Sequence, residues 1–324
     1  MAWDDIFGQA VAKRLLQDHL AAGCVAGAYL LVGPDGVGKR LLALEAVKAL
    51  NCLGEGPRPC ERCSACAQAG RGVHPDIHVL LPGGASLQVK IDDVKRLLSR
   101  LALRPFSGAV QVAIIDGAER LTEEAANALL KTLEEPSMRA HFFLTTARVS
   151  DCLPTITSRC QLIRCAGLRH EDVCRILTAR SGCTPPVAEA IARLSHGSAA
   201  AALAMAQRWG VSAALRKQLA DERLSTWLAQ PLPETRQELA DCLEEMIGWL
   251  RDVAVASVAG LERVTRTMCA QEIARHVERL PWDRCLETAF ELLRLRESLE
   301  QFVNPRLVAS LAREKWLSLT TVQC

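Results

Sequence analysis

Short apolar runs separated by amphipathic stretches dominate the first half of the chain. Runs at 28–32, 77–81, 110–116, 140–146 and 161–164 have the length and composition of buried strands. Between them, apolar residues recur at helical spacing over 10–20, 41–50, 91–98 and 123–135. Largely apolar strands that alternate with helices predict an α/β fold, in which a parallel sheet is covered by helices on both faces.

The second half of the chain lacks strand-like runs after about residue 167. Short helices are expected over 171–208, including an Ala-rich helix over 199–206, and Pro231 and Pro233 mark a boundary. Beyond it, apolar residues repeat at helical spacing, and Asn304-Pro305 is typical of a helix start. We therefore predict three domains: an α/β domain over 1–166 with an insertion at 52–76, a small helical domain over 167–208, and a helical C-terminal domain over 209–324.

A glycine-rich segment, Gly33-Pro34-Asp35-Gly36-Val37-Gly38-Lys39-Arg40, follows the first apolar run. A strand before it and a helix after it are the context that a phosphate-binding loop requires. Its glycines (Gly33, Gly36 and Gly38) let backbone N–H groups face a phosphate, and Lys39 would reach the outer phosphates. The last position should carry a hydroxyl for Mg²⁺, but Arg40 has no acceptor atom. The pattern predicts a nucleotide site that has lost its metal; a glycine-rich turn unrelated to nucleotides is the alternative.

Asp116 ends the third apolar run, where P-loop proteins hold the aspartate that orients magnesium. Hydrolysing members place a second acidic residue beside it, but the next residue here is Gly117, and Glu119 is less well placed. The missing hydroxyl at position 40 and the missing carboxylate at position 117 together predict an ATPase-like fold without hydrolysis and without Mg²⁺. They leave open whether ATP or ADP binds. A solvated residue at the end of a strand is the alternative for Asp116.

Four of the 14 cysteines form a tight group with the spacing C-x7-C-x2-C-x2-C: Cys52, Cys60, Cys63 and Cys66. Four thiolates complete a closed, tetrahedral zinc site with no open position for catalysis. The insertion at 52–76 has few apolar residues, so it could hardly fold without a metal. We predict a structural Zn²⁺ here, with unmetallated cysteines as the alternative. The other ten cysteines are expected to be reduced and to pack as small hydrophobes.

Charge is nearly balanced along the chain, with a formal net charge of +2. Neither half is basic enough to bind nucleic acid through its overall field, so any such contact must be local or shared with partners. No run approaches the roughly 20 apolar residues of a membrane span, and the N-terminus lacks the pattern of a signal peptide. We expect a cytoplasmic protein without a membrane partner.

Two further motifs are more specific than the phosphate loop: Leu-Leu-Lys-Thr-Leu-Glu-Glu-Pro at 129–136, and Ser158-Arg159-Cys160. Together with Phe7-Gly8-Gln9, the loop and the four-cysteine insertion, they make almost the whole chain resemble the clamp-loader AAA+ proteins of bacterial DNA polymerase III. In that family the Ser-Arg-Cys arginine is similar to an arginine finger, so Arg159 is expected to act in trans on the ATP of a neighbouring subunit. Thr145 or Thr146 falls at the sensor position.

The resemblance also implies the domains' roles and the partners. Residues 167–208 would form a lid, and 209–324 a collar that joins subunits. The expected partners are motor and clamp-opening subunits, with the sliding clamp and primed DNA reached through the complex. Because Arg40 and Gly117 depart from the hydrolysing pattern, they favour a stator without ATPase activity of its own, working as part of the DNA polymerase holoenzyme.

Four alternatives remain beside this interpretation. An ATP-hydrolysing motor of the same family is disfavoured because it keeps a Thr after the lysine. A zinc-dependent DNA-binding protein is disfavoured because the insertion lacks a basic, aromatic run. Arg159 could instead be a surface arginine paired with Asp151, and the C-terminal apolar stripes fit an ordinary helical core as well as a collar.

Overall fold

The computed structural model of the protein describes residues 3–83, 88–134, 139–219, 235–300 and 303–320. The chain divides into two compact units: Met1–Ile176 with His196–Ala201, and Leu177–Ser195 with Ala202–Cys324. The predicted boundary at Pro231 and Pro233 lies outside the described residues. The three-domain division at 1–166, 167–208 and 209–324 stays a prediction.

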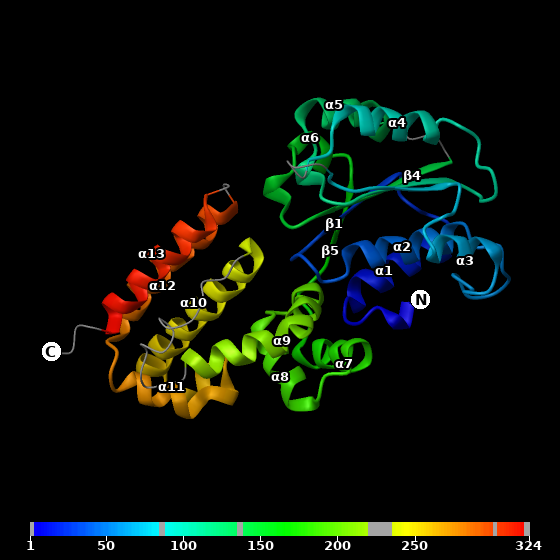
Figure 1. Ribbon diagram of the computed structural model, residues 1–324. Coiled ribbons are helices and arrows are strands. Elements are labelled where there is room, and N and C mark those ends of the chain that lie inside the picture. The colour runs from blue at the N-terminus through cyan, green and yellow to red at the C-terminus, as the bar shows by residue number, and fades with distance from the viewer. Residues whose placement is uncertain (1–2, 84–87, 135–138, 220–234, 301–302, 321–324) are drawn as a thin grey trace. The chain divides into compact units, whose positions relative to one another are not determined.

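A parallel sheet of five strands forms the centre of the first unit (Figure 1). The strands are β1 (Ala28–Val32), β2 (Ile77–Leu80), β3 (Gln111–Ile115), β4 (Ala140–Thr146) and β5 (Gln161–Arg164). Their order across the sheet is β2-β3-β4-β1-β5, with every neighbouring pair parallel. Every residue of β1 and β3 is buried, as expected for strands covered on both faces. The predicted α/β fold is confirmed.

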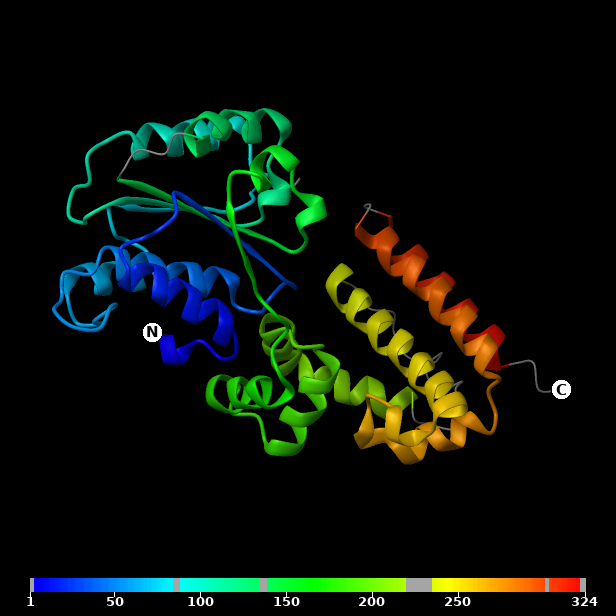
Figure 2. The same cartoon turned by 180° about the vertical axis from the view of Figure 1, so that it is seen from behind.

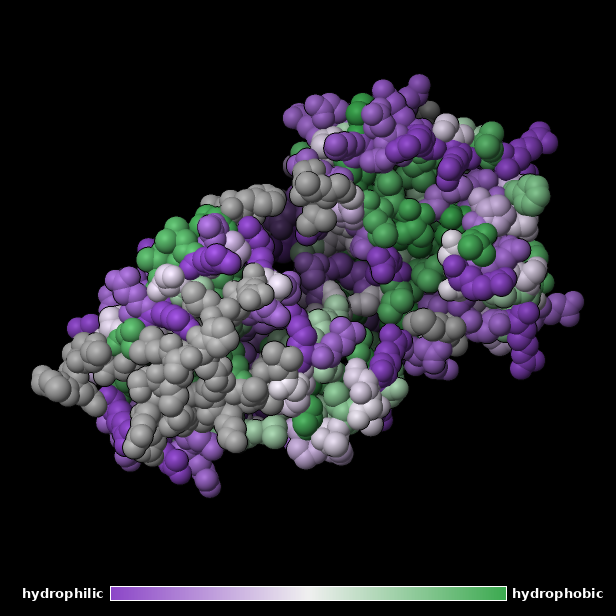
Figure 3. Space-filling model, in the orientation of Figure 1, coloured by the Kyte–Doolittle hydropathy of each residue, from purple (hydrophilic) through white to green (hydrophobic). Residues whose placement is uncertain are grey.

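Helices cover both faces of this sheet (Figures 1 and 2). One face carries α1 (Ala10–Ala21), α2 (Lys39–Leu50) and α3 (Ser64–Gly70), and the other carries α4 (Ile91–Leu101), α5 (Glu123–Glu134) and α6 (Pro154–Thr157). Short 3-10 turns lie at Trp3–Asp5, Ala118–Arg120 and Val149–Asp151. Apolar side chains of β1, β3 and β4 alternate between two cores, one under α1 and α2 and the other under α4 and α5. Figure 3 shows hydrophilic side chains over the outer faces of α4 and α5, with apolar side chains beneath them.

The strand register brings three chain segments to one edge of the sheet. Val32 at the end of β1 pairs with Thr146 at the end of β4. Ile115 at the end of β3 pairs with Leu144, one residue before Thr145. The segments that follow β1 and β3 therefore start beside the end of β4, because the carboxyl ends of parallel strands share an edge.

Helices make up the second unit. Its segments are the end of α7 (His170–Ser181), α8 (Pro185–Leu194), most of α9 (Ala199–Leu219), α10 (Arg236–Ala259), α11 (Ala270–Val277), α12 (Trp282–Glu300) and α13 (Pro305–Thr320), with 3-10 turns at Leu261–Arg263 and Thr267–Cys269. The core of α10, α12 and α13 holds the buried indoles of Trp249 and Trp316. Among the described helices, none combines the length and the apolar character needed to cross a membrane.

Two helix ends test the sequence patterns directly. The N–H of Arg306 donates to Asn304 Oδ1 at 3.0 Å, so Asn304-Pro305 starts α13 as predicted. The Ala-rich helix begins at Ala199 but continues to Leu219, well beyond the predicted end at residue 206.

Candidate functional site

The glycine-rich segment forms a tight loop between β1 and α2, at the carboxyl edge of the sheet. Gly36 and Gly38 have φ of +75° and +97°, values that residues with a Cβ rarely adopt. Gly33 is required for another reason, because a Cβ there would lie 2.0 Å from the carbonyl oxygen of Cys165. The three glycines therefore fix the shape of the loop and its close fit to the segment after β5.

Lys39 is held inside this loop. Its ammonium group donates to the carbonyl oxygens of Gly33 at 2.6 Å and Pro34 at 2.9 Å, and it pairs with Asp35 at 3.3 Å. Only 7% of the side chain is exposed. An ammonium group has three donors, so the loop's own atoms can satisfy all of them.

Arg40 extends from the start of α2 toward the end of β3. Its guanidinium group lies 3.4 Å from Asp116 Oδ2. The other carboxylate oxygen of Asp116 accepts the hydroxyl of Thr145 at 2.6 Å, and that hydroxyl oxygen also accepts the N–H of Gly117 at 3.0 Å. The carboxylate that would orient magnesium in a hydrolysing protein is thus paired with a cation of the chain itself.

The structure separates the two threonines at the sensor position. Thr145 contacts Asp116, whereas the hydroxyl of Thr146 donates to the carbonyl oxygen of Arg148 at 3.0 Å. The alternation of side chains along a strand explains the difference, because neighbouring residues point to opposite faces. Thr145 is therefore the residue that the geometry brings to this site.

Other groups fix the loop in ways that the sequence pattern did not reveal. The N–H of Ala200 donates to the carbonyl oxygen of Gly36 at 3.2 Å, and a Cβ on Gly36 would lie 2.3 Å from Ser198 Oγ. The amide of Gln9 donates to the carbonyl oxygens of Val37 at 3.3 Å and Ala166 at 2.6 Å. The bond between Gln9 and Ala166 joins residues 157 positions apart, and Ala200 is farther still from Gly36, so no local signal could have identified these contacts.

Arg159 lies on the turn between α6 and β5. Its Nη1 atom donates to the carbonyl oxygen of Thr155 at 2.9 Å and to Ser158 Oγ at 3.2 Å. Its Nε atom donates to Glu134 Oε1 at 2.9 Å, and Nη2 contacts the same oxygen. The structure pairs Arg159 with Glu134 rather than with Asp151, whose carboxylate lies 3.2 Å from Arg148 Nε, and a surface ion pair stays the alternative to a finger.

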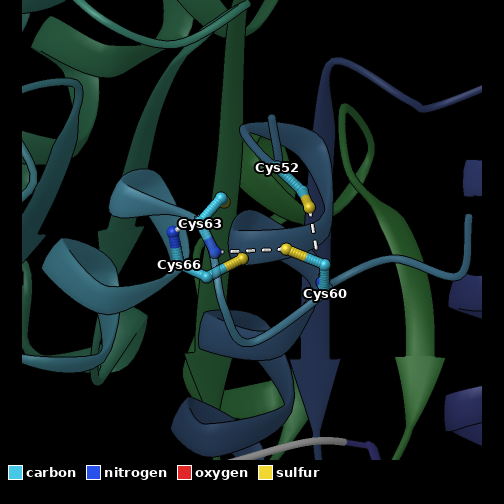
Figure 4. A group of neighbouring side chains, drawn as sticks. All are labelled: Cys52, Cys60, Cys63 and Cys66. Atoms are coloured by element: carbon cyan, nitrogen blue, oxygen red, sulfur yellow. Dashed lines mark hydrogen bonds between the residues drawn. The ribbon is translucent and has the colours of Figure 1, made fainter. Parts of the chain in front are cut away.

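The four cysteines come together beside the end of α2 (Figure 4). Cys52 follows α2, Cys60 lies in the connecting loop, Cys63 caps α3 and Cys66 lies in its first turn. Their sulfur atoms lie within 4.8 Å of one another. Tetrahedral zinc with Zn–S bonds near 2.3 Å separates its sulfurs by about 3.8 Å, so the cluster fits one metal ion.

Backbone N–H groups already point at three of these sulfurs. The N–H groups of Cys60, Cys63 and Cys66 donate to the sulfurs of Cys52, Cys60 and Cys63 at 3.3 to 3.4 Å. Burial opposes ionisation of Cys63, but the N–H groups of Cys66 and Leu53 lower its pKa to about 6. Burial and the hydrogen bond with Cys63 raise the pKa of Cys66 to about 12. A metal ion would favour the ionised form of all four thiols, since it binds thiolates.

A buried set of charges connects this cysteine cluster to α2. The ammonium group of Lys48 lies 3.0 Å from Glu45 Oε1 and 2.5 Å from Glu61 Oε1. Lys48 and Glu45 are each 1% exposed, and Glu61 lies between the second and third cysteines. Burial lowers the pKa of Lys48, but its bonds to Glu61 and Glu45 outweigh this effect and raise it. The cation therefore stays charged and attaches the insertion to α2.

Comparison with known proteins relates this geometry to a family. A family model described as "DNA polymerase III, delta subunit" matches residues 8–169. DNA polymerase III subunit delta' of Pseudomonas aeruginosa is 34% identical over 229 residues, which cover 64% of this chain and 67% of that protein. DNA polymerase III subunit gamma of Buchnera aphidicola is 33% identical over 159 residues, which cover 49% of this chain and 42% of that protein.

The chain thus spans less than half the length of that gamma subunit. Among solved structures, a DNA polymerase III gamma-subunit-related protein of Thermotoga maritima aligns with 95% of this chain and 99% of its own, at 20% identity and a TM-score of 0.48. The family match includes the sheet, the phosphate loop, the cysteine cluster and Ser158-Arg159-Cys160 together. The chain therefore belongs to the DNA polymerase III delta-subunit family, which confirms its resemblance to the clamp-loader AAA+ proteins.

Proposed function

We propose that, within the DNA polymerase III clamp loader, this chain is a stator that does not hydrolyse ATP and supplies Arg159 to the ATP site of a neighbouring subunit. In this role it joins motor and clamp-opening subunits in the cytoplasm and helps load the sliding clamp onto primed DNA during replication. The observation that carries the proposal is the ion pair between Arg40 and Asp116.

This ion pair opposes metal-dependent hydrolysis for two reasons. Mg²⁺ needs oxygen ligands, and Arg40 stands where the hydroxyl ligand should be. The guanidinium charge beside Asp116 also repels a second cation from that carboxylate. Gly117 adds no carboxylate to polarise a water molecule, so neither half of the usual hydrolytic apparatus is present at these positions.

The remaining loop contacts support the same role. Lys39 is already bound by loop carbonyl oxygens, and Gly36 packs against Ser198 and Ala200. A phosphate entering the loop would have to displace these contacts. We therefore propose a structural role for the candidate nucleotide residues, with any nucleotide binding independent of Mg²⁺: Gly33, Gly36, Gly38, Lys39, Asp116 and Thr146.

Arg159 is suited to act on a neighbour rather than on this chain's own loop. It lies on an exposed turn with 30% of its side chain accessible. A guanidinium group carries a permanent charge and planar donors, which match the phosphoryl oxygens of a transition state. We propose that it enters the neighbouring ATP site when the subunits assemble.

We propose that Zn²⁺ is the metal that Cys52, Cys60, Cys63 and Cys66 hold. An all-thiolate, closed set of ligands suits zinc and leaves no position for a reactive water molecule. When bound, the ion supplies cross-links within an insertion that has little core of its own. Its role in this proposal is to hold the insertion at 52–76 folded.

In this proposal the helices within 209–324 form the collar, and those within 167–208 form the lid. Several apolar side chains on the last two helices of the collar are exposed, including Phe290 at 64%, Leu307 at 55% and Leu293 at 37%. Apolar residues left outside the core of α12 and α13 support a role in joining subunits.

The similarity to a gamma subunit favours a second candidate, an ATP-hydrolysing motor of the same loader. ATP turnover distinguishes the two. We expect no Mg²⁺-dependent turnover by the isolated chain, since Arg40 and Gly117 replace the groups that hydrolysis needs. Mg²⁺-dependent turnover that disappears in Lys39→Ala, with the folding of that variant shown to be unchanged, would identify a motor and overturn the stator role.

A loader reconstituted from all its subunits tests Arg159. We expect Arg159→Ala to leave assembly intact and to lower DNA-stimulated ATP turnover and clamp loading, by less than the about 10³–10⁵ typical of GTPases because other ATP sites keep working. Arg159→Lys should restore little, since an ammonium group loses the planar fork. Arg148→Ala, another exposed and ion-paired arginine, is the matched control. Equal rates for Arg159→Ala and wild type in an intact complex would exclude the finger.

A further inference from the structure

Two motifs that are far apart in the sequence meet at one ion pair. Glu134 is the last residue of α5 and belongs to the Leu-Leu-Lys-Thr-Leu-Glu-Glu-Pro motif, whereas Arg159 belongs to Ser-Arg-Cys. Both Nε and Nη2 of Arg159 donate to one oxygen of Glu134, Oε1. The proposed function gives Arg159 a role but none to Glu134.

We propose that Glu134 is a positioning residue for Arg159: it fixes the guanidinium group for its approach to the neighbouring ATP. This inference rests on the proposed function, in which Arg159 acts in trans. Glu134 itself touches no substrate in this proposal. It acts only through the arginine.

The contacts restrain the guanidinium group from two sides. Thr155 and Ser158, on the arginine's own turn, bind Nη1, while Glu134 binds the opposite edge through Nε and Nη2. Long arginine side chains otherwise sample many rotamers, and holding one of them in advance removes that entropic cost from the reaction. Among the described residues, these four bonds engage all three guanidinium nitrogens of the isolated chain. A phosphate that meets the planar fork on assembly replaces the bonds of Nη1 to its own turn, while Glu134 keeps its hold on Nε.

The backbone on both sides of the pair is anchored in the same core. Leu133, next to Glu134, is 4% exposed, and Ile156, in the turn before Arg159, is 1% exposed. Both side chains belong to the core under α4 and α5. The distance between the two charged residues is therefore set by packed elements, which is what a positioning contact requires.

Exposure keeps this pair accessible to a partner. The side chain of Glu134 is 50% exposed and that of Arg159 is 30% exposed. Water screens the attraction at such a site, so the carboxylate orients the guanidinium group without cancelling its charge toward a more highly charged phosphate. A fully buried pair would instead have kept the arginine from its proposed target.

The test compares Glu134→Ala and Glu134→Gln with wild type in the reconstituted loader, each with Arg159 intact and with Arg159→Ala. We expect Glu134→Ala to lower DNA-stimulated ATP turnover about three- to tenfold, and Glu134→Gln less, because misplacement of a catalytic group by about 1 Å can cost up to 10²-fold. With Arg159→Ala, neither change should lower the rate further. Glu124→Ala, an exposed carboxylate at the other end of α5, is the matched control.

A measurement on the full isolated chain complements the rates. The Nε–H of Arg159, observed by NMR in arginine-labelled protein and assigned by its loss in Arg159→Lys, should exchange with water faster in Glu134→Ala than in wild type. A structural role elsewhere in α5 would not change this signal.

The possible outcomes distinguish the positioning role of Glu134 from the finger role of Arg159. If Arg159→Ala is slow but Glu134→Ala is as fast as wild type, or faster, the positioning role is wrong and the finger stands. If Glu134→Ala lowers the rate equally in the Arg159→Ala background, Glu134 acts on folding or assembly, and the proposal is also wrong. If Arg159→Ala itself changes nothing, the proposed function fails and the positioning role fails with it.

Discussion

The phosphate loop and the cysteine cluster lie at opposite ends of α2, and they differ in where their polar groups find partners. At the start of the helix, Lys39 binds loop carbonyl oxygens and Arg40 binds Asp116. At its end, the four thiols lie within 4.8 Å of one another. In the phosphate loop, other groups of the same chain already bind the two cations. The four cysteine sulfurs are instead arranged as one metal ion requires.

The difference shows that a binding motif and a binding site are separate properties. The phosphate loop keeps the glycines and the lysine of its pattern, yet its charges are neutralised from within. The cysteine cluster lies in an insertion with few apolar residues, so we expect its order to depend on the metal that binds there. We therefore expect changes at the two ends of α2 to have very different consequences.

Metal removal should have the largest effect. Structural zinc contributes about 10–16 kcal/mol in isolated zinc-finger peptides, and its loss should unfold the insertion at 52–76 while the sheet stays folded. Cys63→Ser should do the same, with Cys24→Ser, an exposed cysteine outside the cluster, as the control. Metal analysis and limited proteolysis measure both effects. Less than half an equivalent of zinc, in protein purified without chelator, would contradict the predicted site.

Breaking the buried charges beside the cluster should have the next largest effect. Lys48→Met leaves Glu45, 1% exposed, without its cation, and removing one partner of a buried pair typically costs about 3–5 kcal/mol. Adding Glu45→Gln should recover part of this loss, since the uncompensated charge is then gone. Urea unfolding gives the free energies, and Lys95→Met on the exposed side of α4 is the control.

An unchanged free energy of unfolding in Lys48→Met would show that this ion set does not attach the insertion to α2. Zinc content measured on the same variant sharpens the result. A stable protein that has lost its zinc would assign Lys48 to the metal site, and a destabilised protein that keeps its zinc would assign it to the attachment.

Arg40→Thr should have the smallest effect. The Arg40–Asp116 pair is 53% and 31% exposed, and such pairs contribute about 0–1 kcal/mol. The new hydroxyl restores the magnesium ligand of the pattern, but Gly117 still supplies no second carboxylate, so we expect no ATP turnover. Urea unfolding and an ATPase assay with Mg²⁺ measure the two results. ATP turnover by Arg40→Thr would show that Arg40 by itself prevents hydrolysis in the wild-type protein.

The fold was largely predictable because buried parallel strands leave a local signature. The apolar runs at 28–32, 140–146 and 161–164 match β1, β4 and β5 residue by residue. The long helix α9 was not predicted in full, because the polar and glycine-containing sequence after residue 206 lacks clear periodicity. The apolar repeats predicted beyond Pro233 do lie on helices, but a single sequence does not tell a core face from an exposed one, and Phe290 on α12 is 64% exposed.

In the candidate site, too, only the features with a local sequence signal were predicted. The spacing of the four cysteines predicted their cluster, since ligands two residues apart can reach one ion. Lys48 with Glu61 and Arg159 with Glu134 were missed, because these pairs join residues 13 and 25 positions apart through the tertiary fold. The Asp151 alternative failed because it assigned Arg159 a partner from its immediate neighbourhood, while the actual partner lies at the end of another helix.

The anchoring of Lys39 changes how a common experiment should be read. Replacing the lysine of a phosphate loop is the usual control for loss of nucleotide binding. Here the ammonium group joins the carbonyl oxygens of Gly33 and Pro34 and is almost fully buried, so its removal takes this donor from the buried Gly33. A weaker loader containing Lys39→Ala would therefore report a distorted loop before it reported anything about ATP, and the folding of that variant has to be measured alongside its activity.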